Sequence, residues 1–91
     1  MRVIQIAPED NVAVALCPIT AGEVVQIGEQ VAVKVLEDVP QGHKIALKEI
    51  KKEENIIKYG FAIGHATAEI KAGSWVHTHN MATNLAGEIE Y

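Results

Sequence analysis

The chain contains one cysteine, three prolines and few aromatic residues among its 91 positions. Because Cys17 is the single thiol, the chain cannot form an internal disulfide bond, and this suits a reducing compartment such as the cytoplasm. One Phe, two Tyr and one Trp leave any core largely aliphatic. These shortages predict one small domain, residues 1–91, with a thin core of aliphatic side chains.

Long apolar runs and basic residues are also scarce. No run of 18 apolar residues occurs, and no basic segment followed by an apolar stretch opens the chain, so we expect neither a membrane span nor a signal peptide. The 8 Lys and Arg residues are outnumbered by 12 Asp and Glu, which gives a net charge of −4. A nucleic-acid partner requires a basic face, so this balance argues against one. We therefore expect a cytoplasmic protein that binds neither membranes nor nucleic acids.

A short frame recurs along the chain: an apolar residue, two residues, Gly, two residues, and a second apolar residue. It occupies residues 19–25, 39–45, 50–56 and 70–76. Gly at the centre of the frame supplies the positive φ of a tight turn between two short strands. Four such turns flanked by Val and Ile predict an all-β domain of short hairpins. The third copy carries Glu53 instead of Gly, at a cost of about 1 kcal/mol in the left-handed region, so we expect that turn to differ in type.

Alternating and β-branched segments place the strands. We expect them over residues 2–6, 11–16, 24–27, 31–35, 44–47, 56–59, 61–63 and 74–79, with a turn at Gly28 and Glu29. The segment 47–57 also has helix-friendly composition and near-helical spacing of apolar residues. Glu54 interrupts that apolar face and a β-branched pair follows it, so we favour strand–turn–strand. Residues 81–91 have weak periodicity and predict a loop, a short helix or a connection to another element.

The histidines carry the strongest functional signal. His65, His77 and His79 fall within fifteen residues, and the last two are spaced i, i+2. In an extended strand this spacing sends both imidazoles to one face, with their Cα atoms about 6.5–7 Å apart. Two such rings can converge on one metal ion or one anionic ligand, and neutral imidazole is a common ligand of divalent iron, zinc and manganese.

The sequence around these histidines resembles a known family. Residues 59–67 (YGFAIGHAT), 70–73 (IKAG) and 75–80 (WVHTHN) are similar to the N-terminal domain of altronate and galactarate dehydratases, and the same module resembles the small subunit of sulfolactate sulfo-lyase. The resemblance spans essentially the whole chain and includes residues 43–47 (HKIAL). It implies a SAF-like β-clip fold, mostly β, built of short bent hairpins with few or no helices.

The resemblance also implies a function. In this family the small module precedes a larger catalytic region or pairs with it as a separate chain, so we expect a small subunit or excised domain of a hydro-lyase, inactive alone. Dehydration of a hexonate such as altronate removes the C2 proton and the C3 hydroxyl and yields a 2-keto-3-deoxy acid. A divalent metal, Fe2+ or Mn2+, that chelates the carboxylate and a hydroxyl would stabilise the enediolate.

The family likeness assigns expected roles to the motif residues. His77 and His79 are expected to be catalytic and to ligate the metal. His65, Thr78 and Asn80 are expected to bind substrate. The imidazoles could instead hydrogen-bond the carboxylate or protonate the leaving hydroxyl, and the sequence does not choose among these roles.

Each assignment has a structural alternative. His77 and His79 could be exposed strand residues without a ligand, and His65 could satisfy backbone groups of a turn. Asn80 is as compatible with an Asx turn or a helix cap as with ligand contact. We interpret His43, which follows Gly42, as a surface turn residue.

Two further residues have simple structural interpretations. Trp75 shares strand parity with both C-terminal histidines and is expected to form a platform packed beside the site. Cys17 precedes a proline and lacks a nearby cationic group in the sequence, so we expect a small buried hydrophobe instead of a nucleophile.

Three functions remain open at the level of sequence. The first is the small subunit of a hexonate hydro-lyase, and the second keeps the architecture but releases sulfite from sulfolactate. The third is a non-catalytic module that binds sugar acids or assembles with a partner chain. A thin core and open strand edges predict self-association or a stable complex with a large catalytic subunit.

Overall fold

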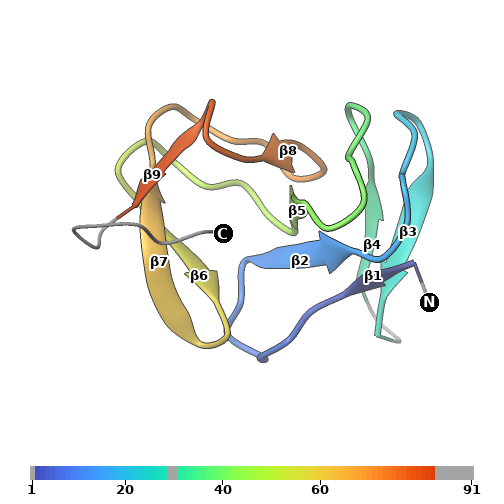
Figure 1. The fold of residues 1–91 in the computed structure, drawn as a ribbon, viewed down its shortest axis with the longest axis horizontal. Helices are drawn as coiled ribbons and strands as arrows, with labels where there is room; N and C mark the ends of the chain where they lie inside the picture. Colours follow the sequence, from blue (N-terminus) through green and yellow to red (C-terminus); the bar gives the residue numbers. More distant parts are fainter. Residues whose placement is uncertain (1, 29–30, 84–91) are drawn as a thin grey trace.

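The computed structural model of the chain describes residues 2–28 and 31–83. Within these ranges the chain forms short strands and no helix (Figure 1). These residues therefore include no helix that could cross a membrane. The strands are β1 (Val3–Ile4), β2 (Val12–Ala15), β3 (Val24–Ile27), β4 (Val31–Lys34), β5 (Lys44–Ala46), β6 (Asn55–Lys58), β7 (Phe61–Ala66), β8 (Trp75–Val76) and β9 (Met81–Thr83). The prediction of a mostly β, SAF-like domain of short hairpins is confirmed, and strand–turn–strand is correct for residues 47–57. Glu29 of the predicted turn and residues 84–91 lie outside the described residues.

Among the described residues, all strand pairs are antiparallel and form three small sheets. The central sheet has the order β1-β2-β5-β8, with Val12 opposite Ala46 and Ile45 opposite Trp75. The β3–β4 hairpin lies at one end of the molecule and the β6-β7-β9 sheet at the other, with the central sheet between them (Figure 1). The sequence-predicted strand over residues 74–79 is too long, because β8 ends at Val76.

The four copies of the frame form four equivalent turns. The leading apolar residues are buried, and they pair across the structure as isolated bridges, Ile19 with Val39 and Ile50 with Ile70. In each turn the N–H of the fifth residue donates to the carbonyl of the second residue. These bonds are Glu23 to Thr20, His43 to Pro40, Glu54 to Lys51 and Ser74 to Lys71, with N···O distances of 3.1, 3.1, 2.9 and 3.0 Å.

Each turn is then fixed to a buried residue by two reciprocal backbone hydrogen bonds. The N–H of the fourth residue donates to the carbonyl of a buried Val or Ala, and the N–H of that residue donates back to the carbonyl of the fifth residue. The fourth residues Gly22, Gly42, Glu53 and Gly73 pair in this way with Val35, Ala15, Ala66 and Ala46. The frame found in the sequence is therefore a repeated unit of backbone hydrogen bonding.

The third turn has the same type as the others, so the expectation that Glu53 would change it is wrong. Glu53 has φ of 75°, beside 94° for Gly22 and 90° for Gly73. Its side chain is exposed, and the strain of about 1 kcal/mol is offset because the positive φ preserves both reciprocal hydrogen bonds.

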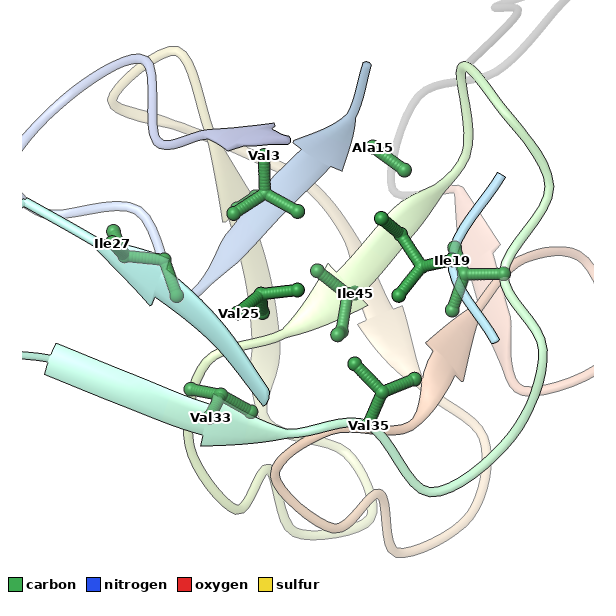
Figure 2. Packing of buried hydrophobic residues seen from close by; sticks show 10 residues of the cluster. Val3, Ala15, Ile19, Val25, Ile27, Val33, Val35 and Ile45 are labelled. Atoms are coloured by element: carbon green, nitrogen blue, oxygen red, sulfur yellow. The ribbon is translucent and has the colours of Figure 1, made fainter. Parts of the chain in front are cut away.

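The second pair of turns repeats the first at an offset of 31 residues, from Ile19 to Ile50 and from Val39 to Ile70. The same offset of 31 residues relates β3 to β6. It also relates β2 to residues 43–46, which include β5. Each half contributes an aliphatic cluster, as expected from the shortage of aromatic residues. The first cluster lies between the central sheet and the β3–β4 hairpin, where Val25, Val35 and Ile45 converge (Figure 2).

The central sheet serves both clusters because successive side chains point to opposite faces. Ala13 and Ile45 pack into the first cluster, while Val12, Ala46 and Val76 pack into the second with the β6-β7-β9 sheet. Lys44 falls on the same face as Ala46, and its side chain is fully buried. A cation therefore occupies a position that the alternation assigns to the interior.

Two adjacent buried polar residues, Asp10 and Asn11, tie the start of β2 to the β6–β7 hairpin. The Asp10 carboxylate accepts hydrogen bonds from the N–H groups of Tyr59 and Gly60 at 3.0 and 2.8 Å. The Asn11 side chain accepts one from the N–H of Ile57 at 2.7 Å and donates to the first carbonyl of β6 at 2.9 Å. These bonds satisfy backbone groups that the short strands leave unpaired.

The turn glycines differ in how much room surrounds them, and this predicts unequal mutational costs. A Cβ on Gly73 would collide with the carbonyl oxygen of Lys34, while a Cβ on Gly22 would meet no atom within 4 Å. Gly22→Ala should lose only the left-handed preference, about 1–2 kcal/mol, whereas Gly73→Ala should lose about 3 kcal/mol or more because the backbone must also move. Urea melts of both variants test this, and equal losses would contradict the predicted collision.

Candidate functional site

The register between β5 and β8 brings two histidines together. Lys44 lies opposite Val76 and Ile45 lies opposite Trp75 in this antiparallel pair. Continuing the register by one residue sets His43 opposite His77, and their ring centroids are 4.3 Å apart. Side chains directly opposite each other on antiparallel strands are natural contact partners.

Trp75 connects three imidazoles into a ring cluster, defined as His43, Trp75, His77 and His79. The indole is parallel to the His77 ring, at 6.0 Å between centroids and 9° between planes. It also lies 4.6 Å from the His79 ring and 5.7 Å from the His43 ring. The interpretation of Trp75 as a platform beside the histidines agrees with this geometry.

The two C-terminal histidines do not share a strand face, because the chain turns after Val76. The carbonyl of His77 accepts hydrogen bonds from the N–H groups of Asn80 and Met81 at 3.1 and 3.0 Å. The Asn80 side chain accepts from the N–H of His77 at 3.0 Å and donates to the carbonyl of Trp75 at 2.9 Å. Asn80 thereby satisfies locally the groups that a longer strand would pair with a neighbour, and the shared contact with Trp75 brings the rings together.

The remaining predicted site residues lie in different places. Asn80 has both ends of its amide bonded within the turn, which is the structural alternative, and Thr78 is exposed on that turn. His65 is on β7, in the other sheet, opposite Asn55 and Ala82.

Sequence reasoning missed two residues of this region, His43 and Lys44. His43 is a half-buried member of the ring cluster and not only a surface turn residue. The repeated frame carried a signal for His43. The second and fourth turns bond to the neighbouring strands β2 and β5, so the residues at these two turns lie close together. Lys44 is buried beside it, and burial, followed by repulsion from Lys58, lowers its pKa to about 8.

The environment of His77 favours a neutral ring. Burial is the main cause that lowers its pKa, followed by the charges of His43, Lys44 and His79. Its Nδ1 atom is enclosed and has no hydrogen-bond partner among residues 2–28 and 31–83. Nε2 is therefore the ring nitrogen left to contact a ligand.

The described residues do not complete a metal site. In the part of the chain that the structure describes, no group of three or more His, Cys, Asp or Glu side chains is placed to hold a metal ion. A catalytic metal generally has three protein ligands. The described residues therefore do not by themselves supply the ligand set of a catalytic metal.

Two surface hollows, of about 400 and 390 Å3, lie away from the ring cluster. Both are lined by Asn11 and Lys48, and the larger also by exposed carboxylates including Glu53 and Glu54. Neither hollow has a histidine among its lining residues. The convergence of three imidazoles makes the ring cluster the stronger candidate site.

Comparison with known proteins assigns the chain to a family. The altronate/galactarate dehydratase SAF domain family matches residues 1–84. The chain belongs to this family. It is 47% identical over its whole length to altronate dehydratase of Escherichia coli (strain K12), and 46% identical over 91% of its length to altronate dehydratase of Bacillus subtilis (strain 168). It spans only 18% and 16% of the lengths of these relatives.

A second kind of relative shares part of this SAF domain. The chain is 46% identical over 46 residues to (2R)-sulfolactate sulfo-lyase subunit alpha of Paracoccus pantotrophus, which covers 50% of the chain and 69% of that subunit. The resemblance to both groups of lyases is thus confirmed.

The neutral state of His77 predicts a pH dependence of stability. Its pKa in the folded chain lies below the ordinary value of 6.5, so the unfolded chain takes up a proton first as pH falls. The contribution of neutral His77 to the free energy of unfolding is fully present above about pH 6.5. It is lost as the pH falls through the lowered pKa of His77. His77→Gln should lose less stability than the wild type between pH 7 and pH 5.

Urea melts of both proteins at each pH, with a chelator present, measure this difference. The carboxylates that titrate in the same pH range are common to both proteins, so the difference between the two reports on His77. Parallel loss of stability in the two proteins would show that the pKa of His77 is not lowered.

Proposed function

We propose that this SAF domain is the small subunit or domain of a cytoplasmic hydro-lyase that dehydrates a hexonate such as altronate to a 2-keto-3-deoxy acid. A larger catalytic portion completes the site. The observation that carries the proposal is the convergence of three imidazoles on Trp75 within a domain of this family.

The length of the relatives supports the role of a larger portion. The two altronate dehydratases extend far beyond the 16–18% that the chain matches, and that remainder has room for the groups missing here. Strand β1 lies at an edge of the central sheet, where another chain can pair with it, so the proposal includes a large-subunit partner and self-association.

The chain's own residues would act at the proton-transfer steps. Neutral His77, with Nδ1 enclosed, can use Nε2 to accept a proton or to donate a hydrogen bond. His79 is exposed on the turn and held against Trp75, so it can reach a ligand that contacts both chains. These roles make His77 and His79 the proposed catalytic residues, with His65, Thr78 and Asn80 as more peripheral binding candidates.

A divalent metal, Fe2+ or Mn2+, would supply charge stabilisation of the enediolate when bound. His77 and His79 are the ligands that this chain offers. The other ligands would come from the larger portion of the enzyme.

The likeness to subunit alpha of sulfolactate sulfo-lyase supports a second candidate. In that case the same architecture would release sulfite from sulfolactate instead of water from a hexonate. A non-catalytic binding or assembly module is the third candidate. Assays of the assembled enzyme with altronate and with sulfolactate separate the first two, and activity of the large chain alone would favour the third.

Replacing both His77 and His79 by Ala should remove activity from the assembled enzyme without unfolding the domain. Loss of one transition-state contact reduces the rate at least about tenfold, and the double change should exceed this. The two side chains are partly or fully exposed, so the free energy of unfolding should fall by only about 0.5–1 kcal/mol. Steady-state kinetics with altronate and thermal melts measure the two effects.

Val76→Ala is the matched control between the two site positions. Val76 is fully buried in the second cluster, so its truncation should cost about 2 kcal/mol of stability while the folded fraction turns over normally. Wild-type turnover in the double-His variant would contradict the catalytic assignment and favour an assembly module.

A further inference from the structure

His43 occupies the fifth position of its turn, where it cannot make the capping hydrogen bond that equivalent residues make. At the equivalent position of the first and third turns, Glu23 and Glu54 cap their own turns by accepting a hydrogen bond from the N–H of the second frame residue, at 2.5 and 2.7 Å. In the second turn that residue is Pro40, which has no N–H. The side chain of His43 therefore has no donor to cap in its turn.

His43 instead accepts a hydrogen bond from the Trp75 indole. The Trp75 Nε1–H donates to His43 Nδ1 at 3.0 Å, across 32 residues of sequence. An accepting Nδ1 carries the lone pair, so the neutral ring must hold its proton on Nε2. The indole thus selects one tautomer of His43.

The geometry of the cluster leaves this Nε2–H available. Nδ1 is engaged by Trp75 and the side chain is half-buried, so Nε2 is the ring nitrogen that remains for a ligand. The His77 ring lies 4.3 Å away between centroids, on the opposing strand end. His43 therefore presents a neutral N–H donor within the same cluster as the proposed catalytic histidines.

We propose that His43 is a substrate-binding residue that donates its Nε2–H to the carboxylate of the acid substrate, and that Trp75 is the positioning residue that sets its tautomer. This inference rests on the proposed function, because it takes the ligand to be a sugar acid. A carboxylate has acceptors only, so a ring held as an Nε2–H donor matches it.

Kinetics of the assembled enzyme with altronate test the assignment. His43→Ala should raise KM about tenfold or more, as expected for loss of a hydrogen bond to a charged group, with a smaller change in kcat. His43→Gln should recover most of the affinity, because its amide N–H can replace Nε2–H. Trp75→Phe keeps the ring but removes the indole N–H, and should raise KM to an intermediate value.

Glu54→Ala is the matched control, since Glu54 holds the equivalent position of the third turn and lies outside the ring cluster. Its KM should equal that of the wild type. Thermal melts of all variants confirm that each is folded under the assay conditions.

Nitrogen-15 NMR of the histidine rings gives a readout independent of turnover. In the wild-type chain at neutral pH, His43 should show a protonated Nε2 and an unprotonated Nδ1, and Trp75→Phe should shift this toward a mixture of tautomers. An active wild-type enzyme whose KM is unchanged in His43→Ala would overturn the assignment of His43 alone. A wild-type enzyme that dehydrates no hexonate would overturn the proposed function, and the assignment with it.

Discussion

In each of the four turns, an N–H donates to a buried Val or Ala whose own N–H donates back, and this closed pair of hydrogen bonds sets the positions of the neighbouring strands. The strands are two to six residues long and offer few ladder bonds of their own. Buried backbone groups must nevertheless be satisfied. The turns meet this requirement, and they do so with Glu53 as well as with glycine because the bonded geometry outweighs the side-chain preference.

The ring cluster depends on two of these turns. The second turn ends at His43, the fourth leads into Trp75, and the pairing of β5 with β8 places the two side by side. Asn80 then bends the chain so that His79 meets the indole from beyond the strand end. The candidate functional side chains lie at strand ends and turns that are held by backbone hydrogen bonds. Binding residues on small β domains usually lie at such places.

Features that depend on local pattern could be predicted from the sequence. The recurring frame predicted the turns, alternation predicted most strands, and the shortage of aromatic residues predicted an aliphatic core. Trp75 was placed beside His77 and His79 from strand parity, and this contact exists although the strand is shorter than expected.

Features that depend on long-range pairing or on competing terms could not be predicted in this way. His43 joins the cluster only through the register of two strands about thirty residues apart. For Lys44, alternation pointed to the interior and charge to the surface, and the packing of the second cluster decided between them. The predicted strand ends at Val76 because the Asn80 side chain hydrogen-bonds the N–H of His77 and the carbonyl of Trp75 in place of a neighbouring strand.

The Asp10–Asn11 link also has a consequence for how the chain folds. Besides a local bond from the N–H of Ala7 to Asp10, these two adjacent side chains have partners in the β6–β7 hairpin that lie 44 to 50 residues further along the chain. A contact of such sequence separation requires closure of a long loop before it stabilises anything, which slows folding. During synthesis, the start of β2 must wait for the β6–β7 hairpin to emerge, and until then a carboxylate and an amide stay hydrated at the edge of a half-formed sheet. The hydration of these two groups gives the incomplete chain a polar boundary that disfavours premature burial of that edge.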